Sequence, residues 1–240
     1  MVRGKTSWVV AGVGAALLLV SVAWASFSDA VSDGLRRDAI QQAACAMPAD
    51  GLTVIGGADD VTVVSDGATG GVHVARHLTW SPWSPAPTAS EHLNGSTLEL
   101  EADCSGLVGW CDVDYVVTVP EHLDVTVDNE SGDVTVTGTF GSTVLKTGSG
   151  DIATARLQAT ELTAYADSGD IDLELDAVVP AVDVRAGSGD VSVILPKDAR
   201  YALSLDSGSG EQDVNVATDP GSASSMQVRT GSGDLELDHR

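Results

Sequence analysis

The chain has few aromatic and few basic side chains. Aromatic residues make up 4% of its 240 residues, and 12 Lys and Arg stand against 35 Asp and Glu, which gives a formal net charge of -23. A field of that sign repels phosphate backbones, so nucleic acid is excluded as a partner. The abundant Val, Thr, Asp and Gly favour strands and turns over helices.

Motifs of known catalytic chemistry are also lacking. The sequence contains no nucleophile elbow, phosphate loop or paired zinc motif. His73 and His77 share one face of a predicted strand, but four strand residues separate them by about 13 Å, which is too far for one metal ion. We therefore expect a non-enzymatic protein with no catalytic residue and no cofactor. The alternative is a polysaccharide-active hydrolase or lyase that uses clustered carboxylates.

One long apolar run occurs, at residues 8–27, and it contains no charge. Twenty such residues span a bilayer core of about 30 Å as a helix, and Trp8 and Trp24 lie near its ends, as interfacial aromatics do. Basic residues precede it, which predicts that residues 1–7 are cytoplasmic, that 8–27 form a transmembrane signal-anchor, and that the rest lies outside. A cleaved secretory signal remains the alternative, since residues 23–25 fit a cleavage site.

Residues 28–50 are predicted to form a juxtamembrane stalk. Apolar residues at helical spacing suggest a short helix that ends before Pro48; they are Val31, Leu35, Ala39 and Ala43. Cys45 lies in this stalk, too far from the apolar run for lipid attachment. We expect it to be unpaired, with an interchain disulfide as the alternative.

A Ser-Gly-acid tripeptide recurs six times at intervals of 18 to 23 residues. Counted from the acid as position zero, positions -8, -6, +1 and +3 are apolar in 21 of 24 cases, whereas -5 and +2 are mostly polar. Period-two alternation on both sides of a turn predicts two half-buried strands per repeat, and stacking such rungs about 4.8 Å apart buries the apolar columns. The acids are Asp133, Asp151, Asp170, Asp190, Glu211 and Asp234.

Each residue of the tripeptide has a structural explanation. Glycine at -1 permits a positive φ. Serine at -2 has the parity of the apolar columns, which predicts a cramped inner corner where its hydroxyl satisfies a backbone group. The acid at zero has outward parity and accepts hydrogen bonds from turn amides. As an alternative role, the six stacked acids form a ladder whose carboxylates bind calcium.

The repeated GSGD[VI] turns, the VTVP strand end at 117–120 and the N-terminal apolar segment resemble the bacterial putative-adhesin domain family. The resemblance covers roughly residues 51–240 and implies an envelope-tethered β-solenoid of largely unknown function. It also implies a surface module for adhesion, envelope interaction or envelope stress, with a cell-wall glycan or another envelope protein as partner. Gln212 departs from the pattern and predicts a bulged fifth rung. Residues 56–63 lack Ser-Gly and predict a degenerate first rung that caps the stack.

Residues 64–120 interrupt the repeat. Alternating segments at 71–78, 96–103 and 112–119 predict longer antiparallel strands. Cys104 and Cys111 bracket a short loop, which predicts a disulfide in an exported domain, with a zinc site as the rival.

The segment LTWSPWSPAP at 78–87 is the one aromatic-rich loop. Prolines stiffen it, so Trp80 and Trp83 are candidates for a recognition tip. The alternative is that both rings pack on the sheet or cap the solenoid. The predicted fold is thus all-β: a β-solenoid, a parallel β-helix-like stack of two-stranded rungs, with an antiparallel N-terminal part and one preceding transmembrane helix.

Overall fold

The computed structural model describes residues 37–45, 51–57, 60–94, 97–104 and 109–240. These residues form strands and turns with no helix, so the all-β prediction is confirmed for this part of the chain. A search of the same residues for a helix long and apolar enough to span a bilayer found none. The predicted transmembrane segment at 8–27 and the first part of the predicted stalk lie outside the described residues.

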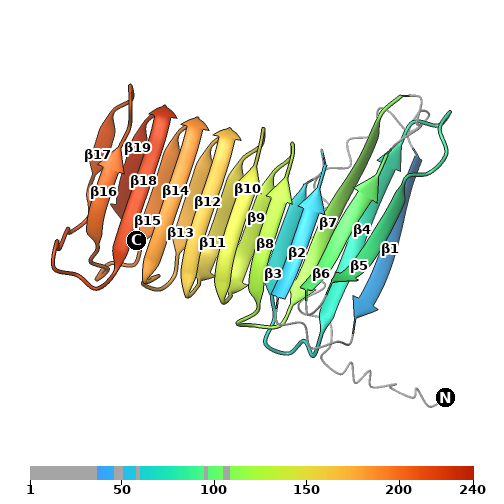
Figure 1. Ribbon diagram of the computed structural model, residues 1–240, viewed down its shortest axis with the longest axis horizontal. Helices are drawn as coiled ribbons and strands as arrows, with labels where there is room; N and C mark the ends of the chain where they lie inside the picture. Colours follow the sequence, from blue (N-terminus) through green and yellow to red (C-terminus); the bar gives the residue numbers. More distant parts are fainter. Residues whose placement is uncertain (1–36, 46–50, 58–59, 95–96, 105–108) are drawn as a thin grey trace, which may run out of the picture. The chain divides into compact units, whose positions relative to one another are not determined.

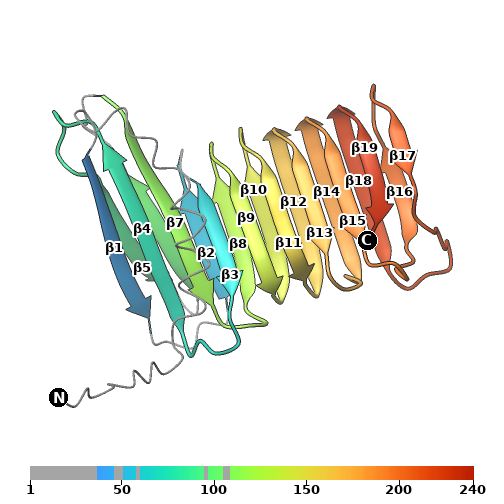
Figure 2. The ribbon, with the colours of Figure 1, turned by 180° about the vertical axis from the view of Figure 1, so that it is seen from behind.

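Two sheets lie face to face, as Figure 1 and the reverse view in Figure 2 show. In the described residues the first sheet has ten strands, in the order β1 (Arg37–Cys45), β4 (Val72–Trp80), β7 (Cys111–Val119), β3 (Val61–Ser65), β9 (Val134–Thr139), β11 (Ile152–Gln158), β13 (Ile171–Leu175), β15 (Val191–Leu195), β19 (Leu235–His239) and β17 (Gln212–Val214). The second has nine, in the order β16 (Ala202–Asp206), β18 (Ser225–Ser232), β14 (Ala181–Ser188), β12 (Glu161–Ser168), β10 (Ser142–Thr147), β8 (Asp124–Asn129), β2 (Gly51–Gly56), β6 (Thr97–Asp103) and β5 (Thr88–Asn94).

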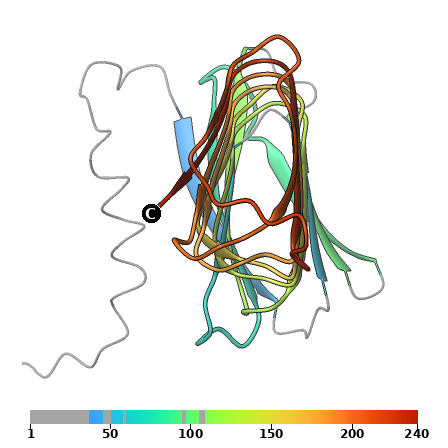
Figure 3. The same cartoon turned by 90° about the vertical axis from the view of Figure 1, so that its left-hand side faces the viewer.

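Each repeat is one rung, with a strand in each sheet joined by the Ser-Gly-acid turn. Neighbouring rungs pair in parallel and in register, so that Leu145 pairs with Ala164 and Ala164 with Val184. Equivalent residues therefore lie on top of one another. The end view in Figure 3 shows the rung turns superimposed around a narrow interior.

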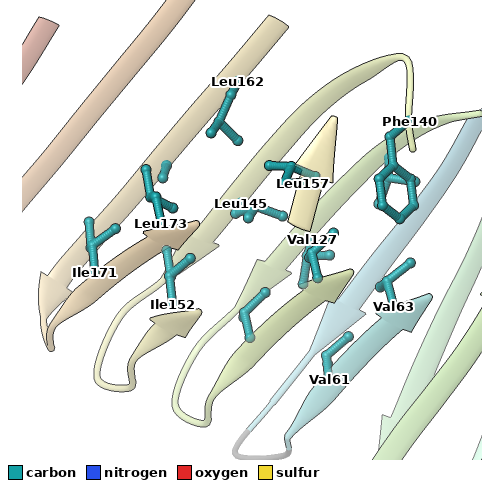
Figure 4. Packing of buried hydrophobic residues seen from close by; sticks show 14 of the residues in the cluster. Val61, Val63, Val127, Phe140, Leu145, Ile152, Leu157, Leu162, Ile171 and Leu173 are labelled. Atoms are coloured by element: carbon teal, nitrogen blue, oxygen red, sulfur yellow. The ribbon is translucent and has the colours of Figure 1, made fainter. Parts of the chain in front are cut away.

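The core is the set of apolar columns that the alternation predicts. All members of the columns at -8, -6, +1 and +3 are buried, except the four from the rung of residues 201–214. Figure 4 shows residues of neighbouring rungs, among them Leu145, Leu162 and Leu173, packed between the two sheets. Burying such a side chain is worth about 1.5 to 3 kcal/mol, so the columns supply the main driving force for stacking.

The N-terminal part of the solenoid combines the predicted antiparallel pairs with parallel ones, since β6 pairs in parallel with β2 and β7 with β3. The strands expected at 71–78, 96–103 and 112–119 are confirmed as β4, β6 and β7, and β4 pairs antiparallel with both β1 and β7. The helix expected in the stalk is wrong over residues 37–45, which form strand β1. Ala39 and Ala43 are four residues apart, a spacing that shares one face in a strand as well as in a helix.

The rungs are not stacked in the order of the sequence. Strands β18 and β19, from the last repeat, lie between β14/β15 and the rung β16/β17, as Figure 1 shows. The fifth repeat therefore ends the stack, and the bulge expected there is not found; a register shift occurs instead in β11, between Thr154 and Leu157. The rung of β2 and β3 is internal, so the prediction that it caps the stack is wrong.

Candidate functional site

Acidic side chains line the edge of the solenoid where the Ser-Gly-acid turns stack. The backbone N–H of each acid donates to the Oδ1 atom of the acid in the adjacent rung, over 2.8 to 2.9 Å. These bonds link seven residues in the spatial order Asp60, Asp133, Asp151, Asp170, Asp190, Asp234 and Glu211. The acid at position zero accepts a turn amide, as predicted, but the amide belongs to the adjacent rung, so the acid is an inter-rung clamp.

This geometry explains which acid is used at each place. An aspartate is the right length to reach one rung along the stack, and the donated N–H offsets part of the repulsion between neighbouring carboxylates. Glu211 belongs to the end rung, where the described residues offer no further rung to clamp. The longer side chain at this position therefore breaks no inter-rung bond.

The row continues past Asp60 into the antiparallel part. The register of β3 and β7 places Asp114 beside Asp60, and His77 lies opposite Asp114 with 3.4 Å between Nδ1 and Oδ2. Burial, Asp112 and Asp60 raise the pKa of Asp114, and the bond from His77 opposes that rise. We call the set of eight carboxylates the acidic row: Asp114, Asp60, Asp133, Asp151, Asp170, Asp190, Asp234 and Glu211.

The carboxyl of Asp172, on the outer face of the first sheet, is also affected by the negative charge of the acidic row. Burial raises the pKa of the Asp172 carboxyl, and the nearby charges of Asp170 and Asp151 raise it further. Two residues of the acidic row therefore disfavour a neighbouring negative charge. The edge is a strongly anionic surface that would favour cations and cationic partners.

Close packing between rungs, more than a positive φ, explains why glycine recurs at position -1. A Cβ at Gly150, Gly169, Gly189, Gly210 or Gly233 would overlap the carbonyl oxygen of the glycine in the adjacent rung. Of the six repeat glycines, a positive φ occurs at Gly132 and Gly189, at 142° and 156°. The prediction of a positive φ is therefore correct for these two glycines. The close approach between rungs explains why glycine recurs at this position along the stack.

The serines at -2 do not lie at an inner corner, so that prediction is wrong. Five of the six are exposed, and Ser131 is half-buried. The inner corner belongs to position -4, where Thr147 and Thr230 are buried and donate their hydroxyls to the carbonyls of Gly132 and Gly189, over 3.1 and 2.9 Å. Burial alternates only as far as position -4: in the rungs of Asp170, Asp190 and Asp234, positions -3 and -2 are both exposed, although strands β12, β14 and β18 continue to -2.

Calcium binding by the ladder stays a prediction. Each aspartate of the linked series commits one carboxylate oxygen to the adjacent amide and keeps the other for solvent or a ligand. No group of three or more His, Cys, Asp or Glu side chains in the described residues is placed to hold a metal ion.

The flank of the second sheet next to the acidic row carries basic residues. Lys146, Tyr165, Arg185 and Arg229 occupy one register row over consecutive strands. Two of the bases are neutralised within the chain, since Lys146 lies 3.8 Å from Asp128 and Arg185 lies 2.7 Å from Asp183. The acidic row remains the dominant charge of this edge.

The other candidate site is at the N-terminal end of the solenoid. The predicted disulfide is confirmed between Cys104 and Cys111, and it ties the end of β6 to the start of β7. Trp80 packs into the core at 8% exposure, whereas the side chain of Trp83 is 74% exposed. The packing alternative is thus right for Trp80 and wrong for Trp83.

Trp110 is a third aromatic residue at this end that the loop pattern did not reveal. It is 46% exposed, and its carbonyl accepts a hydrogen bond from the backbone N–H of Ser81 over 3.0 Å. In the sequence, the position of Trp110 next to Cys111 was the one available sign that it lies at this end of the solenoid. The side chain of Cys45 lies outside the described residues.

The sequence model of the family described as Toastrack DUF4097 matches residues 88–238. No curated protein matches the chain.

Solved structures that match this chain come from several bacteria. A putative cell adhesion protein of Clostridium sporogenes is 15% identical, with 85% of this chain and 100% of that chain covered and a TM-score of 0.49. A putative adhesin of Bacteroides fragilis is 12% identical, with 84% and 97% covered and a TM-score of 0.45. A putative lipid binding protein of Parabacteroides distasonis is 12% identical, with 83% and 96% covered and a TM-score of 0.34.

Proposed function

Because the chain belongs to the Toastrack DUF4097 family, we propose that it is a non-enzymatic, adhesin-like surface module that binds an envelope partner through the acidic row. The module is displayed outside the cytoplasmic membrane on the single-pass anchor at residues 8–27. The partner carries cationic groups: either a cell-wall glycan with free amino groups or a basic face of another envelope protein. The bound state needs no cofactor.

The acidic row is the observation that carries this proposal. Seven of its carboxylates lie on exposed residues, one per rung, and inter-rung hydrogen bonds hold them in line. A rigid line of charges at about 4.8 Å spacing suits an extended partner with repeated cationic groups, because no ordering of the site is required on binding.

The disulfide supports export. Cys104 and Cys111 are bridged, and such bonds persist in oxidising compartments outside the cytoplasm. The uncharged segment at 8–27, with basic residues before it, supplies the signal for export and sets the orientation of the chain in the membrane.

The test is sedimentation of the full chain, in detergent micelles, with isolated cell walls. The variant Asp151→Asn/Asp170→Asn/Asp190→Asn removes three charges from the row and keeps an oxygen acceptor for each amide. The control Glu161→Gln/Asp198→Asn/Asp219→Asn removes three charges from exposed residues outside the row. We expect the row variant to lose wall binding and the control to keep it.

Release of soluble glycan fragments in the same assay would contradict the proposal and favour the alternative of a polysaccharide hydrolase or lyase. Equal binding by both variants would show that the acidic row is not the contact surface.

A further inference from the structure

Three strands of the first sheet meet at one end of their length. Strand β1 begins at Arg37, β4 ends at Trp80 and β7 begins at Cys111, and these three residues share one register row. Figure 1 shows β1, β4 and β7 side by side. The first described residue of the chain therefore lies directly beside the strand end that carries the exposed tryptophans.

The exposed indoles of Trp83 and Trp110 form what we call the aromatic tip. Trp83 occupies the third position of a tight turn that begins at Ser81, closed by the N–H of Ser84 bonded to the Ser81 carbonyl over 3.0 Å, with Pro82 stiffening it. The bond from Ser81 to the Trp110 carbonyl holds the two segments together. Both indoles are thus presented from backbone that is already ordered.

We propose that the aromatic tip lies in the headgroup region of the membrane that holds the chain's own anchor. This rests on the proposed anchor at 8–27. Residues 28–36 alone connect that segment to Arg37, and the ten steps from residue 27 to Arg37 span at most about 36 Å when fully extended. Since Arg37 pairs with Trp80, this length limits the distance between the tip and the bilayer surface.

The chemistry of the tip fits a lipid interface. Tryptophan concentrates at the membrane–water boundary because its ring is apolar and its N–H is polar. The tip brings Trp83 and Trp110 there at 74% and 46% exposure.

The charges beside the tip limit how much of the solenoid approaches the bilayer. Asp114, the first member of the acidic row, lies three residues inward from Cys111, about 10 Å along β7. Anionic headgroups repel the row and do not repel the indoles. The tip therefore touches lipid while the acidic row stays in water, available to its partner.

The experiment measures quenching of tryptophan emission by brominated lipid. The full chain with Trp8→Phe and Trp24→Phe is reconstituted in vesicles of phosphatidylcholine or its brominated form. Only Trp80, Trp83 and Trp110 then emit. We expect brominated lipid to remove most of the emission that Trp83 and Trp110 contribute, and no bromine-dependent loss after Trp83→Phe/Trp110→Phe.

A matched control places an indole at an exposed aromatic position far along the stack. Tyr165 is 40% exposed on β12, and Tyr165→Trp in the background that lacks Trp83 and Trp110 should emit without quenching. Quenching of this indole as well would mean that the whole solenoid lies on the bilayer and would overturn the proposal.

An alkaline wash of the same vesicles separates failure of the anchor from failure of the tip. Chain that is removed by the wash contradicts the anchor and with it this proposal. Chain that stays with the vesicles while its tip is unquenched overturns the tip alone. Emission that responds instead to cell-wall glycan, or to the concentration of chain, would identify a glycan or a second copy as the occupant and overturn the proposal.

Discussion

At the scale of single residues, the aspartate of each turn has two roles. Its Oδ1 atom accepts the amide N–H of the adjacent rung, and its second oxygen contributes to the exposed charge of the acidic row. Serine could cap a turn locally, but its shorter side chain reaches less far along the stack. The charge of the edge is therefore partly a by-product of how the rungs are clamped.

Substitutions at Asp170 test the hydrogen bond that links neighbouring rungs. Asp170→Ala leaves the N–H of Asp190 without its carboxylate acceptor and should lower the free energy of unfolding by about 1 kcal/mol, because the site is exposed to water. Asp170→Asn keeps an oxygen acceptor and should cost less. Urea denaturation measures both, with the exposed Asp198→Ala as the control for lost charge. Equal costs for the Ala and Asn variants at Asp170 would contradict the clamp.

The effect of the acidic row's negative charge on Asp172 can be tested by measuring stability as a function of pH. Burial and the charges of Asp170 and Asp151 raise its pKa above the ordinary value of 3.8, so the folded chain binds this proton more tightly than the unfolded chain. Its charge therefore lowers stability above the raised pKa, and the penalty fades as pH falls through that value. Asp172→Asn should raise the melting temperature at neutral pH, and the gain should shrink as pH falls toward 3.8. A gain that is the same at every pH would rule out this explanation.

At the scale of strands and rungs, the end of the stack differs from its interior. Leu203 and Leu205 are only partly buried, and Gln212 and Val214 are exposed, because no rung in the described residues covers this one from outside. The same columns are fully packed in the repeat that follows in sequence. The polar residue that interrupts the apolar column thus marks a terminal rung.

The reversed order of the last two rungs is tested at one column. Leu237→Asp puts a charge at a fully buried position and should cost several kcal/mol or prevent folding, whereas Val214 is 37% exposed and Val214→Asp should cost under about 1 kcal/mol. Chemical denaturation compares them. Stacking in sequence order predicts the opposite ranking, so a milder effect at Leu237 would contradict the topology.

Calcium tests whether the stacked acids also bind cations. A ligand that binds only the folded state stabilises it by mass action, so millimolar calcium should raise the melting temperature if the row holds the ion. Asp170→Asn together with Asp190→Asn should remove that rise. A melting temperature that is indifferent to calcium and to chelator, at fixed ionic strength, would leave the acids with their clamping role alone.

At the scale of the whole molecule, the proposed anchor would decide where the solenoid is displayed. We expect the anchor at 8–27 to remain in the mature protein, because twenty uncharged residues with tryptophan near both ends suit a spanning helix. Intact mass of the membrane-extracted chain checks this. A mature chain that begins at Ser26 would show a cleaved signal instead.

The structure of a single rung could be predicted from the amino-acid pattern alone. Inward and outward columns depend only on parity within a strand, so the buried and exposed faces could be predicted from local pattern. The recurrence of glycine and aspartate located the turns, but their contacts with the adjacent rung appear only in the structure. The disulfide followed from two cysteines close in sequence. The alternation of burial ends at position -4, before the turn, and for that reason the inner corner was wrongly assigned to position -2.

The order of the rungs and the extent of the sheets could not be predicted from the sequence and depend on the three-dimensional packing. All repeats present nearly the same apolar columns and the same clamp, so any rung can stack on any other and local pattern cannot rank them. The connection at 215–224 lets the last repeat insert ahead of the fifth, and burial favours that order because Leu235 and Leu237 gain more from an interior place than Gln212 and Val214. Strand β1 was likewise decided by its partner, since pairing with β4 supplies the backbone hydrogen bonds that residues 37–45 lack alone.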